Sequence, residues 1–205
     1  MILPQAQTGA GGDPHFVGFN GEHYDFMGAP DKWFVILSDP ELYINAKLVA
    51  LPGNSWGTFF GKISIGYANN QVMVTRLQDR IGLVATCNGN RIGPGFGSLR
   101  IEGQDLVLET SRYIIRVSRV YYERDWDDSL NGVPHLDLLV ELGSEWTKGI
   151  GTHGVLGQTA TTPVVGIPTG GCQGEGIIEG VWTNYQVSGP WATDYTYNLS
   201  RTFSS

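Results

Sequence analysis

The sequence predicts an all-β protein, an antiparallel β-sandwich of two sheets with long loops and little helix. Apolar and polar residues alternate along many short segments, and turn-forming residues separate these segments at near-regular intervals. No stretch of helical length holds a 3.6-residue period that is free of Gly and Pro. Alternation with a period of two is typical of strands that bury one face, and short strands at regular spacing are typical of a sandwich or a barrel.

The expected strands have apolar residues at alternate positions, in 112–122 at Tyr113, Ile115 and Val117. These strands lie at residues 42–48, 63–67, 72–74, 81–85, 99–101, 106–108, 112–122 and 136–142. The last is the clearest, with four aliphatic residues at alternate positions from Leu136 to Leu142. Turns are expected at Asn69-Asn70 and at Asn88-Gly89; the second is a strong hairpin signal because both central positions of the favoured turn need a positive φ. Residues 159–176 are rich in Thr, Gly and Pro and are expected to form a long loop.

The composition limits the domain organisation and the partners. A length of 205 residues suits one large all-β domain or two small ones. No linker divides the chain, so we expect a flexible segment at residues 1–11 and a single domain at residues 12–205. The net charge of −7 disfavours nucleic acid, because such a surface repels phosphate. No apolar run approaches the roughly 18 residues that a membrane-spanning helix needs, so no stable transmembrane insertion is expected.

The two cysteines, Cys87 and Cys172, leave two alternatives open. They could form a disulfide, which would agree with a secreted protein, or they could be two buried free thiols. The chain has no Cys-x-x-Cys pair, so a zinc or thioredoxin-type site has no support.

An unusual string of residues lies near the start of the chain: Gly12-Asp13-Pro14-His15-Phe16, then Phe19-Asn20-Gly21, then Tyr24-Asp25-Phe26-Met27-Gly28. Further blocks follow at Ile44-Asn45-Ala46, at His153-Gly154-Val155-Leu156-Gly157-Gln158-Thr159 and at Ala192-Thr193-Asp194. The first string resembles the opening of a von Willebrand factor type D domain. The ordered blocks, over roughly residues 12–203, are more similar still to the plant root-cap (late-embryogenesis-like) family.

This resemblance implies a secreted, extracellular β-rich module and names no activity. It also implies a structural role for the residues of the motifs, which are Asp13, His15, Asp25, Gly154, Gly157 and Gln158. Type D domains bind calcium through an acidic loop after the block that holds Gly154, but residues 159–163 contain no carboxylate here. Because a hard cation prefers several oxygen ligands with carboxylates among them, no cofactor is expected.

Four residues of the opening motif are the metal candidates: Asp13, His15, His23 and Asp25. Imidazole and carboxylate groups suit zinc or copper, and on a hairpin each Asp would share a strand face with the neighbouring His. The favoured interpretation is structural, because Asp before Pro forms turns and an Asp–His pair can tie one strand end to another.

A loop around Trp126 gathers carboxylates at Asp125, Asp127 and Asp128. Together with Trp56 these are the candidate binding residues, since exposed aromatic rings stack on sugars and anchor protein contacts. The carboxylates have three interpretations: a solvated loop, which is favoured, a set of calcium ligands, or a pair that cleaves glycosidic bonds.

Two further patterns point to chemistry. Gly53-Asn54-Ser55-Trp56-Gly57 matches the G-x-S-x-G of hydrolase nucleophiles, but that geometry needs a helix after the Ser, and a strand is expected there. Asn198 begins an Asn-Leu-Ser glycosylation sequon, which a eukaryotic secretory route could use.

The expected function is a non-catalytic, secreted binding or structural module with an extracellular glycan or protein as partner, and with homo-oligomers as one expected assembly. The first alternative is a secreted defence protein that acts on a target membrane or receptor. The second is a hydrolase that uses Ser55 or the cluster of Asp125 and Asp127.

Overall fold

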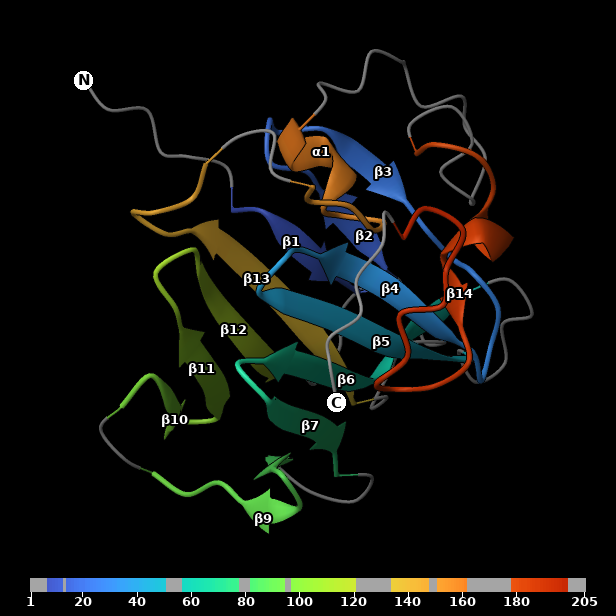
Figure 1. Cartoon of the computed structure of the whole chain (residues 1–205). Helices are drawn as coiled ribbons and strands as arrows, with labels where there is room; N and C mark the ends of the chain where they lie inside the picture. The colour runs from blue at the N-terminus through green and yellow to red at the C-terminus, as the bar shows by residue number, and fades with distance from the viewer. Residues whose placement is uncertain are drawn as a thin grey trace.

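The computed structural model of the chain describes residues 7–12, 14–50, 57–77, 82–94, 97–120, 134–147, 151–161 and 178–198. These residues form fourteen β-strands, one short α-helix and one short 3-10 helix (Figure 1). The predicted all-β class is therefore confirmed.

The strands, in chain order, are β1 (Gly9–Gly11), β2 (His15–Val17), β3 (His23–Asp25), β4 (Trp33–Ser38), β5 (Leu42–Ala50), β6 (Thr58–Tyr67), β7 (Asn70–Arg76), β8 (Leu83–Cys87), β9 (Asn90–Arg91), β10 (Leu99–Glu102), β11 (Asp105–Glu109), β12 (Tyr113–Val120), β13 (His135–Leu142) and β14 (Gln186–Val187). The helices are α1 (Gln158–Thr161) and the 3-10 helix η1 (Trp182–Tyr185). The eight strands expected from alternation coincide with β5 to β8 and β10 to β13.

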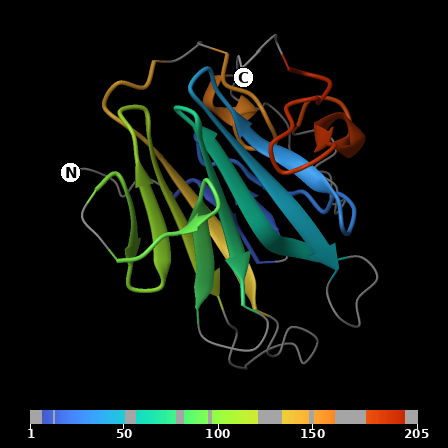
Figure 2. The same ribbon diagram turned by 60° about the horizontal axis from the view of Figure 1, so that its bottom comes forward.

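Hydrogen bonds connect all the described strands into one antiparallel sheet instead of the two separate sheets that the sequence predicts. The order is β10-β11-β12-β13-β6-β5-β4-β14, with β7 to β9 extending from β6 and β1 to β3 extending from β13. The sheet has two halves, one with β1 to β3 and β10 to β13, the other with β4 to β9 and β14. The register joins these halves at one pair of residues, Leu136 of β13 opposite Phe60 of β6. The sheet curls strongly (Figures 1 and 2). A bulge in β6 contributes: Gly61 is the extra residue opposite Lys47 and Leu48, and an extra residue bends a strand and increases its twist.

Both halves of the sheet contribute to a single buried core. Alternate residues of β12 point into it, so Tyr113, Ile115 and Val117 are fully buried. Near the β13–β6 junction the core is aromatic: the Phe16 ring packs edge-on against the Phe60 ring, with 6.1 Å between centroids. Edge-to-face contacts of this kind add to the stabilisation from burial alone.

Strand β4 shows no alternation because both of its faces are covered, and it is buried from Phe34 to Ser38. Residues 151–161 and 178–198 lie against this part of the sheet (Figure 1). Ser38 and His153 exchange backbone hydrogen bonds. On β5 the Asn45 amide nitrogen donates to the carbonyl oxygens of Pro190 at 3.0 Å and Ala192 at 2.9 Å. These contacts attach the C-terminal part of the described chain to the sheet.

Two hairpin turns have the positive φ angles that a tight antiparallel connection requires. Asn88 and Gly89 have φ of 49° and 82°, which confirms the predicted hairpin between β8 and β9. Between β6 and β7 the central residues are Ala68 and Asn69, with φ of 42° and 64°. That turn lies one residue earlier than the Asn69-Asn70 turn expected from the sequence, since Asn70 already pairs with Tyr67.

Residues 9–11, which the sequence assigns to the flexible segment 1–11, form β1 and pair with β13 and β2. Cys87 carries a free thiol, and Cys172 lies outside the described residues. Neither of the two described helices has the length and apolar character needed to cross a membrane.

Candidate functional site

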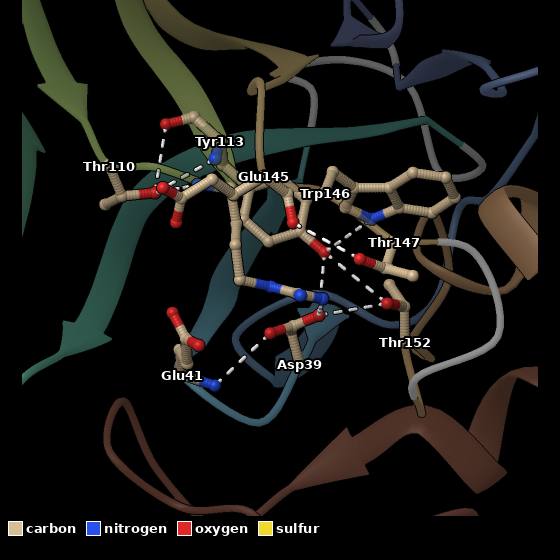
Figure 3. Close-up of polar contacts among 9 residues, drawn as sticks. Asp39, Glu41, Thr110, Tyr113, Glu145, Trp146, Thr147 and Thr152 are labelled. Atoms are coloured by element: carbon tan, nitrogen blue, oxygen red, sulfur yellow. Dashed lines mark hydrogen bonds and ion pairs between the residues drawn. The ribbon is translucent and has the colours of Figure 1, made fainter.

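A buried carboxylate connects three distant parts of the chain. Asp39 lies in the turn between β4 and β5, and its side chain is fully buried. Its Oδ2 accepts hydrogen bonds from Arg112 Nη2 at 2.7 Å, Tyr113 Oη at 2.9 Å and Thr152 Oγ1 at 3.0 Å (Figure 3). Its Oδ1 accepts the backbone N–H of Glu41 at 3.2 Å. We refer to Asp39, Arg112, Tyr113 and Thr152 as the Asp39 cluster.

The turn between β11 and β12 directs two members of the cluster toward the carboxylate. Thr110 closes this turn: its Oγ1 accepts the backbone N–H of Tyr113 at 2.9 Å, and its own N–H donates to the Tyr113 carbonyl at 2.8 Å. The Tyr113 hydroxyl also accepts a hydrogen bond from Trp146 Nε1 at 3.2 Å. Both the backbone and the hydroxyl of Tyr113 are thus held in place.

Tyr113 and Arg112 keep their protons near neutral pH. Burial raises the pKa of Tyr113 to about 12, so its hydroxyl remains a donor. The hydrogen bond to Asp39 raises the pKa of Arg112 above its ordinary value. A buried charge pair is tolerated when its members are paired and hydrogen-bonded, as they are here. The Asp39 carboxylate therefore has a structural role, because its Oδ2 accepts three hydrogen bonds and so joins the β4–β5 turn to Arg112, Tyr113 and Thr152.

A pocket of about 420 Å³ opens beside the Asp39 cluster. It is lined by residues 40–42 of the β4–β5 turn, residues 67–69 of the β6–β7 turn, and Thr110, Arg112 and Tyr113 at the β11–β12 turn. Figure 2 shows these turns at the same end of the strands. We call it the three-turn pocket. Its volume lies within the range of about 300–1,000 Å³ that is common for small-molecule sites.

Arg112 has one unsatisfied donor beside the three-turn pocket. Its side chain is only 8% exposed, and its Nε has no hydrogen-bond partner among the residues that the structure describes. A buried donor without an acceptor destabilises a protein by roughly 1–3 kcal/mol. The Nε atom itself is buried, so a ligand in the pocket does not reach it.

The other groups of the pocket are an exposed carboxylate and an aromatic ring. Glu41 is exposed, and Tyr67 is half-buried, directly opposite Leu42 in the β5–β6 register. Burial raises the pKa of Tyr67, so the ring is uncharged near neutral pH. A carboxylate and a ring together can hold a small polar molecule that has one apolar face.

The opening motif forms a hairpin in which His15 and Asp25 are paired. His15 on β2 lies opposite Asp25 on β3, and His15 Nδ1 is 2.5 Å from Asp25 Oδ1. His23 lies opposite Val17, one pair further along the same face. In the part of the chain that the structure describes, no group of three or more His, Cys, Asp or Glu residues is arranged to hold a metal ion. Asp13 lies outside that part.

Gly154, Gly157 and Gln158 lie where residues 151–161 meet β4. Gly154 has a φ of 104°, and a Cβ there would approach the Ile36 carbonyl oxygen to 2.6 Å. A Cβ at Gly157 would collide with the carbonyl of His153. The Gln158 amide donates to Tyr185 Oη at 3.0 Å and accepts the backbone N–H of Glu179 at 2.8 Å. Gly154 and Gly157 therefore allow neighbouring backbone segments to approach closely, and Gln158 attaches residues 178–198.

A group of aromatic rings surrounds His153, and the sequence interpretation did not anticipate it. The His153 ring stacks on Tyr185 with 6.1 Å between centroids, and its centroid lies 5.0 Å from that of Tyr197. His153 Nδ1 accepts the N–H of Gly154 at 2.8 Å, and Nε2 lies 3.4 Å from Glu179 Oε2. Burial lowers the pKa of His153, and Glu179 opposes this effect. The ring is therefore neutral near neutral pH, with its proton on Nε2.

The remaining candidates divide into residues that the structure describes and residues that it does not. Ser55, Trp56, Asp125, Trp126, Asp127 and Asp128 lie outside the described residues. Asn198 is half-buried, and its amide nitrogen donates to the Thr193 carbonyl oxygen. Glycosylation at Asn198 would require this hydrogen bond to break.

Asp39 and Arg112 are the residues that the sequence interpretation missed. They are 73 positions apart, and each by itself has an ordinary explanation, an Asp before Pro in a turn and an Arg before a strand. The local signal in the sequence was Arg112, a charged residue directly before the alternating apolar residues Tyr113, Ile115 and Val117. No family model matches the chain, and no curated protein matches it at a significant level.

Proposed function

We propose that the protein is a non-catalytic extracellular module that binds a glycan or protein partner through the three-turn pocket. The observation that carries this proposal is the pocket itself, which opens at one end of the sheet and is lined by the exposed carboxylate of Glu41 and the half-buried ring of Tyr67. A concave site with an apolar wall and a few polar groups is the usual form of a ligand pocket.

The contacts that hold the walls of the pocket in place favour binding. The Asp39 cluster joins the β4–β5 turn to the β11–β12 turn, and the Leu42–Tyr67 pair places the β6–β7 turn beside them. Walls that are already fixed lose little conformational freedom when a ligand enters. The site is thus preorganised for recognition.

The chemistry of the pocket favours binding over catalysis. Asp39 Oδ2 already accepts three hydrogen bonds, and the Tyr113 hydroxyl has a pKa of about 12. A general base or acid works best with a pKa near the working pH, and a nucleophile needs a free, activated oxygen. The Tyr113 hydroxyl does not meet the first requirement and Asp39 Oδ2 does not meet the second, so recognition is the use that their arrangement supports.

Binding arrays test the proposal. The purified chain is applied to arrays of extracellular glycans and of extracellular proteins, and we expect selective binding to a small set of them. Glu41→Trp, which places a bulky ring at the mouth of the pocket, should abolish that binding. Glu141→Trp is the matched control, because Glu141 is also an exposed carboxylate but lies on β13 away from the pocket lining.

Two results would contradict the proposal. Blank arrays together with dye release from lipid vesicles would favour the secreted defence protein. Release of soluble sugars from a glycan would favour the hydrolase, and loss of that activity in Ser55→Ala or Asp127→Asn would identify its residues.

A further inference from the structure

Strand β3 lies at an edge of the sheet, with no described strand on its outer side. It pairs with β2 alone, without a bulge, and contains neither Pro nor Lys, the features by which proteins protect strand edges from pairing with other chains. The edge of β10, in the same half of the sheet, is partly covered by the bridge between Pro94 and Ile101. We infer that two copies of this chain associate by antiparallel pairing of their β3 strands, with His23 of each copy opposite Asp25 of the other.

The backbone of β3 is oriented for such a pairing. At the start of the β2–β3 hairpin, the Glu22 carbonyl oxygen accepts Gly18 N–H at 2.8 Å. The direction of hydrogen bonding alternates along an antiparallel strand, so the N–H and C=O groups of His23 and Asp25 point away from β2. Among the described residues these groups have no hydrogen-bond partner. When two β3 strands meet about a two-fold axis at Tyr24, these groups bond to one another across the axis.

The side chains of β3 are complementary to themselves in this register. Residues directly opposite each other have Cβ atoms about 4.5–5.5 Å apart, which brings the imidazole of His23 within reach of Asp25 of the second copy. His23 is exposed and makes no hydrogen bond or ion pair with the described residues. Asp25 uses Oδ1 to bond His15 Nδ1, so Oδ2 can accept from the second imidazole. An imidazole N–H donates to a carboxylate whether the ring is neutral or charged.

The core holds β3 in the conformation that pairs. Tyr24 is buried, its ring stacks on Phe16 with 5.2 Å between centroids, and its hydroxyl donates to the Val155 carbonyl oxygen at 2.8 Å. An edge that is already ordered loses little conformational freedom when a second strand is added. The strand is short, so we expect a weak and reversible dimer. No residue that lines the three-turn pocket lies on β3, so the dimer would present two such pockets to a partner with repeated sites.

Two measurements on the unmodified chain test the inference. Sedimentation equilibrium over a series of protein concentrations measures the dimer dissociation constant, and NMR measures amide hydrogen exchange at the lowest and highest concentrations. We expect a monomer–dimer equilibrium in which the N–H groups of His23 and Asp25 exchange more slowly as the concentration rises. A chain that stays monomeric throughout, or a dimer in which both N–H groups exchange as in the monomer, would overturn the inference.

Exchanging the two side chains between copies locates the contact. His23→Asp places carboxylate opposite carboxylate, and Asp25→His places imidazole opposite imidazole, so we expect each variant alone to dimerise about tenfold more weakly or worse. In an equal mixture of the two variants every carboxylate again faces an imidazole, and association should return to nearly the wild-type strength. Gln71→Asp is the matched control, because it adds a carboxylate at an exposed position of β7, which lies between β6 and β8, and should leave dimerisation unchanged.

The outcomes bear on this inference alone and not on the three-turn pocket. Dimerisation that is as strong in His23→Asp as in the unmodified chain would show that the copies meet elsewhere. A mixture of folded variants that fails to regain association would contradict the proposed register. Circular dichroism checks the folding of each variant, and His23→Asp with the exchange measurement decides the question even if Asp25→His, which loses its bond to His15, does not fold.

Discussion

Asp39 shows how one residue can hold the end of a sheet together. Removing a carboxylate from water is unfavourable, and its charge is compensated by Arg112 and by the hydroxyls of Tyr113 and Thr152. The same contacts join the β4–β5 turn, the start of β12 and the residues before Gly154. The position of the three-turn pocket therefore depends on this residue.

We expect Asp39→Asn to lower the free energy of unfolding by about 3–5 kcal/mol, because it leaves the buried Arg112 guanidinium without its counter-ion. Asp31→Asn is the matched control. Asp31 pairs with Lys47 at 2.9 Å, but its side chain is 79% exposed, and a surface pair contributes about 0–1 kcal/mol. Urea denaturation followed by circular dichroism measures both values. Equal, small losses would show that Asp39 contributes no more than a surface pair.

At the scale of elements, residues 151–161 connect β4 to the C-terminal part of the described chain. Gly154 allows the backbone to approach Ile36, and Gln158 bonds to both Tyr185 and Glu179. His153 lies between these attachments, with its ring among tyrosines. A proton added to this ring would convert Nδ1 from an acceptor into a donor and break its hydrogen bond with Gly154 N–H.

The low pKa of His153 predicts a loss of stability in acid. Its pKa in the folded protein lies below the ordinary value of 6.5, mainly because of burial. The unfolded chain therefore binds the proton more readily, so the stability linked to His153 is complete above pH 6.5 and is lost as the pH falls through the folded pKa.

The control for this prediction is His153→Asn, whose amide oxygen can accept from Gly154 N–H and does not titrate. Urea denaturation is carried out at a series of pH values from about 7.5 down to about 5. We expect the wild-type protein to lose more stability over this range than the variant. Parallel curves for the two proteins would mean that His153 does not contribute to the pH dependence.

At the scale of the whole molecule, the two halves of the curled sheet share one core. They are hydrogen-bonded to each other at Leu136 and Phe60, yet buried residues from both halves form a single cluster. A shared core makes the stability of each half depend on the other, because neither can separate without exposing apolar surface. We therefore expect the described chain to unfold as one cooperative unit.

We expect a single unfolding transition in urea. Trp33 and Trp182 report on the β4 side of the sheet, Trp146 reports on the region of Tyr113, and far-ultraviolet circular dichroism reports on all the strands. Coincident fluorescence and dichroism curves are the expected result for a two-state protein. Two separated midpoints would show that the halves unfold independently.

Parts of the fold and of the site could be read from the sequence, and parts could not. The alternating strands and the Asn88-Gly89 hairpin were predicted correctly, because burial of one face and a positive φ leave local patterns. Strand β4 left no alternation because it is covered on both faces. The three-turn pocket was not anticipated, since its walls come from three turns that are far apart in the chain.

The sequence by itself determined the all-β class and the position of eight strands, because these depend on the spacing of apolar side chains a few residues apart. Only the tertiary structure decided that the strands form one curled sheet, that Asp39 meets Arg112, and that three turns form a pocket. These features depend on which strand ends come together in space. The packing of the whole core determines which strand ends come together, and no local pattern in the sequence indicates this packing.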